Sequence, residues 1–106
     1  MKALLVVLAL SLSPAAREFM DITAKLEPVQ CEKRKLRRDI ALAEVESRSE
    51  DLKALRAKFA TLNREPKTAK LERRLAELER HIARSSDPED LQAISRQQRA
   101  AFYRCE

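Results

Sequence analysis

The chain contains no glycine in its 106 residues. Glycine supplies the positive φ angles of tight hairpin turns, phosphate-binding loops and the nucleophile turn of hydrolases, so its absence argues against the folds that depend on them. Charged residues make up 37% of the chain and aromatic residues only 4%. A composition dominated by Leu, Ala, Glu, Arg and Lys is typical of long helices and coiled coils. We therefore expect an all-α fold.

The first residues have the pattern of a secretory signal peptide. Lys2 precedes an apolar run over residues 3–12, which small residues follow and which is too short to cross a bilayer. We expect residues 1–15 to be removed by cleavage after Ala15, with cleavage after Ala16 as the second choice. The protein is then periplasmic or secreted. An uncleaved N-terminus that lies on or anchors to a membrane is the alternative.

Apolar side chains in the middle of the chain recur at steps of three, four and seven, which places them on one face of a helix. They are Leu42, Val45, Leu52, Leu55, Phe59 and Leu62. Proline suits the first turn of a helix because it has no backbone N–H to donate. We therefore expect one long helix over about residues 29–63 that begins near Pro28. Before it, residues 16–28 form an N-terminal arm, whose weak helical pattern fits either a short arm or a loosely ordered lead-in.

Two shorter helices are expected to follow. A seam with heptad-like spacing predicts a helix over about residues 67–84. The seam consists of Leu71, Leu75, Leu78 and Ile82. After it, Asp87 can cap a new helix and Pro88 can take its first position, which predicts a third helix over residues 88–105.

The expected helix lengths suggest how the chain folds. A helix of about 33 residues is roughly 50 Å long, and the two shorter helices of about 18 residues each are together long enough to retrace it. We expect the long helix to fold back against the two shorter ones as a helical hairpin or three-helix, coiled-coil-like bundle, which makes residues 29–106 one domain. Cys105 then ends near Cys31, and a disulfide between them staples the domain. Two free thiols or an intermolecular bridge are the alternatives.

No pattern in the sequence indicates catalysis. His81 is the only histidine and has no second histidine or nearby cysteine at metal-ligand spacing. The carboxylates lie on helical faces of mixed charge, where nothing forces a pair into an apolar cleft. We expect a protein that is not an enzyme and uses no cofactor or metal.

One concentrated charge feature is a candidate partner-binding site. The cluster consists of Lys33, Arg34, Lys35, Arg37 and Arg38, and Arg99 of the last helix is expected to approach it. With a net charge of +5, the chain suits an acidic envelope or secreted protein, or anionic lipid or polysaccharide. A merely solvated face is the alternative. The aromatic residues do not alternate with the cluster, which disfavours nucleic acid, and a leftover apolar stripe suggests a homodimer.

The C-terminal run Gln98-Arg99-Ala100-Ala101-Phe102-Tyr103-Arg104-Cys105 resembles the closing motif of the LprI-like secreted proteins, and Leu55-Arg56-Ala57-Lys58-Phe59 is similar to a second element of that family. The family motif has Trp where this chain has Ala101. The resemblance implies an exported helical protein stapled by cysteines.

Because the LprI-like family includes lysozyme inhibitors, the resemblance also implies, as an alternative function, inhibition of a wall-degrading enzyme. The basic charge argues against that alternative, since lysozymes are usually basic too and would be repelled. Our first hypothesis is therefore a small exported interaction module of the cell envelope.

Overall fold

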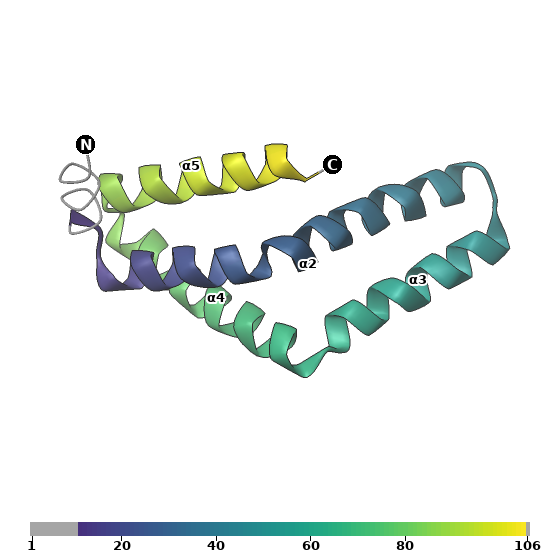
Figure 1. Ribbon diagram of the computed structural model, residues 1–106, viewed down its shortest axis with the longest axis horizontal. Helices are drawn as coiled ribbons and strands as arrows, with labels where there is room; N and C mark the ends of the chain where they lie inside the picture. Colours follow the sequence, from purple (N-terminus) through teal and green to yellow (C-terminus); the bar gives the residue numbers. More distant parts are fainter. Residues whose placement is uncertain (1–10, 106) are drawn as a thin grey trace. The chain divides into compact units, whose positions relative to one another are not determined.

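The computed structural model describes residues 11–105, and every regular element in this part of the chain is an α-helix (Figure 1). The four helices are α2 (Pro14–Val45), α3 (Ser49–Arg64), α4 (Pro66–Ser85) and α5 (Pro88–Arg104). The predicted all-α class is confirmed. Residues 1–10 of the expected signal peptide lie outside the described residues.

The chain divides into two compact units. The terminal unit combines Met1–Lys25 with Arg73–Glu106, and the central unit is Leu26–Glu72. Helices α2 and α4 are each divided between the two units. The two units are described one after the other.

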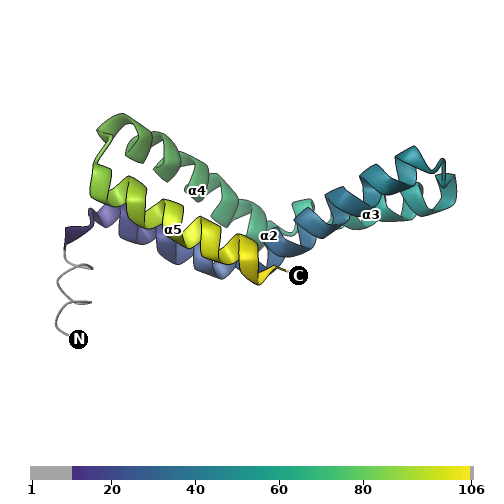
Figure 2. The same ribbon diagram turned by 90° about the horizontal axis from the view of Figure 1, so that it is seen from above.

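Three helical segments form the terminal unit: the first part of α2, the second part of α4, and α5. They lie side by side in both ribbon views (Figures 1 and 2). Their buried apolar side chains recur at steps of three or four along α2 and α4, so each helix turns one face inward. These side chains are Ala16, Phe19, Ile22, Leu78, Ile82 and Ile94.

The expectation of an N-terminal arm over residues 16–28 that is separate from the long helix is wrong. The structure has these residues in α2, where Phe19 and Ile22 are only 3% and 5% exposed. Helix α2 also continues through Pro28 instead of beginning there. Pro28 cannot donate to the carbonyl of Ala24, but both residues are exposed, so water can take the place of the missing donor.

The expected single helix over residues 29–63 is also wrong, because α2 ends at Val45 and α3 begins at Ser49. The chain turns at Ser47, which has a φ of 54°. The backbone N–H of Ser47 donates to the carbonyl oxygen of Glu44 at 3.2 Å, and that of Arg48 donates to the carbonyl oxygen of Ala43 at 2.9 Å. This is the hydrogen-bond pattern of a Schellman ending, with serine in the left-handed position that glycine usually takes.

The ends of α4 and α5 follow from local capping. The Glu65 carboxylate accepts hydrogen bonds from the backbone N–H groups of Lys67 and Thr68, and it does so at the start of α4. Asp87 accepts from the backbone of Glu89 and Asp90 at the start of α5, as the Asp-Pro sequence predicts. The expected ranges of 67–84 and 88–105 differ from these two helices by one residue at most at each end.

In the central unit, α3 lies beside the second part of α2 in both ribbon views (Figures 1 and 2). The buried apolar residues of this unit are Leu26, Leu36 and Ala43, all on α2. Helix α3 has no buried residue. The core of the central unit is therefore thin.

Cys31 and Cys105 form a disulfide, which confirms the predicted bridge. The cysteines are the only two in the chain. Within residues 11–105, no helix is both long and apolar enough to cross a membrane.

Candidate interaction surface

The five basic residues of the predicted cluster all lie on α2 in the central unit, but they point to different sides of the helix. Consecutive helical positions are about 100° apart, so neighbouring residues of the cluster point in different directions. Lys33 is buried, Arg34 and Lys35 are half-buried, and Arg37 and Arg38 are exposed. The cluster is therefore not one continuous patch.

Lys33 serves the interior of the central unit. Its side chain is only 5% exposed, and its Nζ atom lies 2.6 Å from Oε1 of Glu72 on α4. The side-chain amide of Gln30 donates to the same oxygen at 3.3 Å. A buried ammonium group needs such a partner, because an unpaired buried charge is strongly destabilising. The expectation that Lys33 binds a partner is not supported by this position.

Arg37 and Arg38 face solvent and have only weak internal contacts. The guanidinium of Arg37 lies 5.8 Å from the ring centroid of Phe59 on α3, a cation–π distance. Arg38 contacts the carboxylate of its neighbour Asp39 at 3.3 Å. Such exposed pairs add little stability, so both arginines can exchange these contacts for those of a partner.

Arg99, the sixth predicted binding residue, is exposed on α5 in the terminal unit, whereas the other five belong to the central unit.

Apolar side chains are exposed near the basic residues of the central unit. Leu42 and Val45, at the end of α2, are 50% and 83% exposed. On α3, Leu52, Leu55 and Phe59 are half-buried. These residues were predicted to share one face of one helix. The turn at residues 46–48 instead distributes them over two helices, and neither α2 nor α3 buries them fully.

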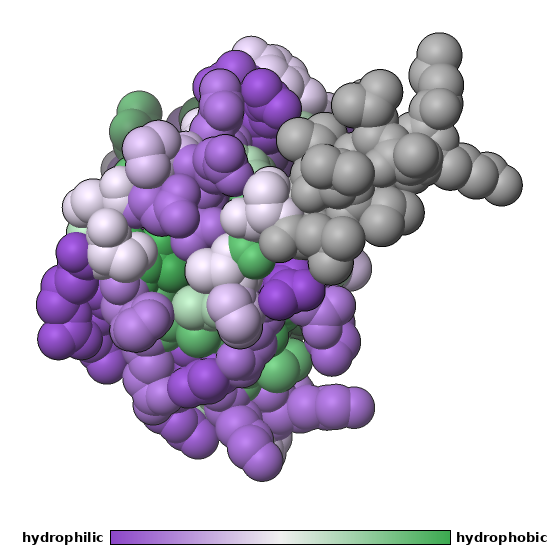
Figure 3. Space-filling view, turned by 90° about the vertical axis from the view of Figure 1, so that its left-hand side faces the viewer, coloured by the Kyte–Doolittle hydropathy of each residue, from purple (hydrophilic) through white to green (hydrophobic). Residues whose placement is uncertain are grey.

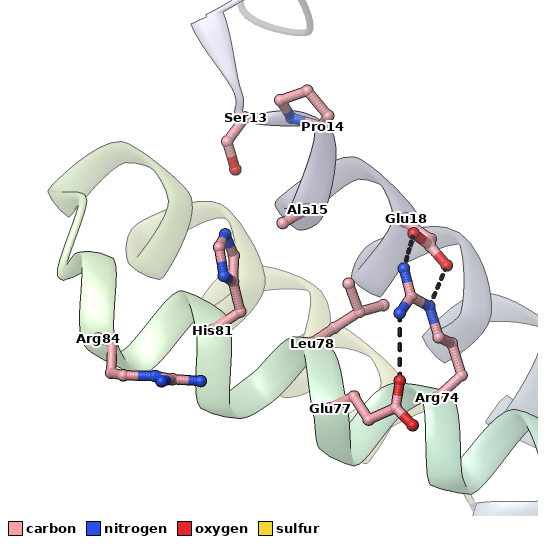
Figure 4. Close-up of a pocket in the computed structure, with 9 residues that line it drawn as sticks. All are labelled: Ser13, Pro14, Ala15, Glu18, Arg74, Glu77, Leu78, His81 and Arg84. Carbon is pink, nitrogen blue, oxygen red and sulfur yellow. Dashed lines mark hydrogen bonds and ion pairs between the residues drawn. The ribbon is translucent and has the colours of Figure 1, made fainter.

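The terminal unit contains an open pocket of about 590 Å³ between the start of α2 and α4 (Figure 4). Arg74 donates to both carboxylate oxygens of Glu18, at 2.7 and 2.8 Å, and to Glu77 at 3.2 Å. The hydrogen bonds from Arg74 lower the pKa of Glu18, and those same bonds raise the pKa of Arg74. The charges of this pocket are thus largely satisfied within the chain.

His81 points from α4 toward the start of α2 in the same pocket (Figure 4). Among the described residues, no group of three or more His, Cys, Asp or Glu side chains could hold a metal ion. Hydrophilic side chains cover most of the coloured surface in Figure 3, and apolar atoms show in smaller groups between them. We find no arrangement here that resembles a nucleophile with its base.

A buried polar contact at the start of α2 was not foreseen from the sequence. Asp90 on α5 is 1% exposed, and its carboxylate accepts hydrogen bonds from the backbone and hydroxyl of Ser13. The two residues are 77 positions apart. Local sequence marks Asp90 only as one of two acids in the first turn of α5, so no local signal predicts this pairing.

The chain was compared with known protein families, curated proteins and solved structures. No model of a protein family matches the chain, and no curated protein or solved structure matches it.

Proposed function

We propose that the chain is an exported helical interaction module whose central unit binds an acidic surface of an envelope or secreted protein. The observation that supports this proposal best is that α3 has no buried residue. Its apolar side chains are half-buried, and Arg37 contacts one of them, Phe59, while remaining exposed. A helix that carries apolar residues without burying them has surface left for a partner.

The chemistry of this surface fits a protein partner. Protein interfaces combine an apolar centre with a polar rim, and arginine and aromatic residues are enriched among those that contribute most to affinity. The central unit offers Leu55 and Phe59 for the centre, and Arg37 and Arg38 for the rim. Two exposed guanidinium groups favour a carboxylate-rich partner, because arginine binds carboxylates through two parallel hydrogen bonds.

Two other partner classes remain as alternatives. The LprI-like resemblance of residues 98–105 suggests an inhibitor of a wall-degrading enzyme, which the net charge of +5 disfavours if the target is itself basic. Binding to anionic lipid or polysaccharide would use the basic residues alone. Such binding should weaken steeply with salt, whereas an interface with an apolar centre should lose less.

The test is capture from envelope extract with the oxidised chain, compared with binding to vesicles of anionic lipid. The test variant reverses the charge at Arg34, Arg37 and Arg38. A matched control variant makes the same change in net charge on the terminal unit, at the exposed residues Arg73, Arg80 and Arg96. Circular dichroism checks that both variants keep the helicity of the wild type.

We expect a single acidic protein to be retained by the wild type and the control variant through moderate salt, and to be lost from the test variant. Equal loss of the partner from both variants would show that the binding depends on net charge alone. Retention of the partner by the test variant would refute a role for Arg34, Arg37 and Arg38. Binding to vesicles that a small rise in salt abolishes would favour the lipid alternative.

A further inference from the structure

The start of α2 is held by a carboxylate buried in the terminal unit. Oδ1 of Asp90 accepts a hydrogen bond from the backbone N–H of Ser13 at 3.0 Å, and Oδ2 accepts one from the Ser13 hydroxyl at 2.6 Å. Asp90 is 1% exposed and, among residues 11–105, is one of the two largest fully buried side chains. A buried carboxylate depends on such donors, because an uncompensated buried charge is costly.

Both of these donors belong to the segment that we expect to be removed on export. Cleavage after Ala15 takes away Ser13 and makes Ala16 the first residue. In the structure, the backbone nitrogen of Ala16 donates to the Ser13 hydroxyl oxygen at 3.1 Å. That single oxygen thus contacts both the nitrogen of Ala16 and the carboxylate of Asp90.

We infer that, in the processed chain, the new α-ammonium group of Ala16 binds the Asp90 carboxylate in place of the lost Ser13 groups. Cleavage creates a positive charge on the Ala16 nitrogen, which only the Ser13 hydroxyl oxygen separates from the buried Asp90 carboxylate. A small shift of the first turn of α2 therefore brings the two charged groups together. The inference rests on the export and cleavage of the proposed function, but it is independent of the partner. Cleavage of the bond between Ala15 and Ala16 would then supply the group that stabilises the buried Asp90 carboxylate in the processed protein.

The remaining charged groups near this site do not replace the ammonium group. Arg74 is engaged with Glu18 and Glu77. Asp87 accepts from the backbone of α5. Among the described residues, the pocket beside the start of α2 is also lined by His81 and Arg84, both on α4 and both exposed.

The experiment is a pH series of thermal unfolding on the chain purified after export, with its N-terminus read by mass spectrometry. Between about pH 7.5 and 9.5, ordinary carboxylates and histidines have lost their protons, and lysines and arginines keep theirs. An ammonium group paired with Asp90 has a pKa above the ordinary value of about 8 for an α-amino group. The stability that it contributes is present below about pH 8 and is lost as the pH rises through the raised pKa.

We expect the melting temperature of the processed wild type to fall by several degrees across this window. The unprocessed chain, whose α-amino group is on Met1, should show no such fall. Asp90→Asn should abolish the fall in the processed chain. Ser13→Ala should lower the melting temperature of the unprocessed chain, because that chain keeps residue 13 and the variant removes the hydrogen bond from its hydroxyl to Asp90.

Three results would overturn the inference. The first is an exported protein whose N-terminus is not Ala16. The second is an equal pH profile for processed and unprocessed wild type, a comparison that needs no variant and therefore holds even if Asp90→Asn fails to fold. The third is a processed Asp90→Asn protein that keeps the alkaline fall. Loss or retention of partner capture bears on the proposed function and leaves this comparison unaffected.

Discussion

Breaking the disulfide between Cys31 and Cys105 should lower the free energy of unfolding by about 4 kcal/mol. The bridge closes a loop of about 75 residues, and the chain-entropy model assigns such a loop roughly 4.5 kcal/mol at 25 °C. A domain of this size is stable by only about 5–15 kcal/mol in total, so the bridge supplies a large share. Because about 1 kcal/mol shifts the melting temperature of a small domain by roughly 4–8 °C, the loss should be about 16–32 °C.

The assay is thermal unfolding followed by circular dichroism on the oxidised wild type, the reduced wild type and the double variant Cys31→Ser with Cys105→Ser. The reduced wild type and the double variant should melt together, and reductant should leave the double variant unchanged. These two controls separate the bridge from any effect of serine at the cysteine positions. Equal melting temperatures for the oxidised wild type and the double variant would refute the reasoning.

Two further changes test the ion pairs of the structure. Glu72→Gln should destabilise the protein by about 2 kcal/mol because it leaves the Lys33 ammonium group buried without its carboxylate, whereas Lys33→Met should cost less; denaturant unfolding compares them, and a larger loss for Lys33→Met would contradict the buried pair. The hydrogen bonds from its arginine partner lower the pKa of Glu18, so their stabilisation is present above about pH 4.3 and lost as the pH falls through the lowered value. The melting temperature of Glu18→Gln should therefore lie below that of the wild type at pH 7 and approach it in acid, while the exposed control Glu79→Gln shows no such convergence; an unchanged difference at low pH would argue against the pair.

The ends of the helices were predictable where proline and a capping acid stand together. Asp87 and Pro88 define the start of α5 because one accepts backbone N–H groups and the other needs none. The turn at Ser47 was not predictable in the same way, since neither glycine nor proline marks it. Its only signal is the seven-residue gap between Val45 and Leu52, which an uninterrupted helix accommodates equally well. A serine with a positive φ replaces the residue type that normally reveals such a turn.

The candidate site was predictable in composition and not in geometry. Five basic residues within six positions are visible in the sequence, but consecutive helical positions are about 100° apart and cannot all face one way. Helical spacing would have separated Lys33 from Arg34. It could not have identified Lys33 as the buried one, because that depends on Glu72, which is 39 positions away and on another helix.

The thin core and the proposed binding surface follow from the same feature of the central unit. If α2 and α3 formed one continuous helix, Leu42, Val45 and Leu55 could share a seam against a single neighbour. The turn at Ser47 instead pairs α3 with the end of α2, where Val45 stays 83% exposed and α3 buries nothing. Such a pair of helices gains little from apolar burial within the chain. A partner that covers this face therefore adds burial that the central unit lacks, and the arginines beside it would select a partner with acidic groups at its rim.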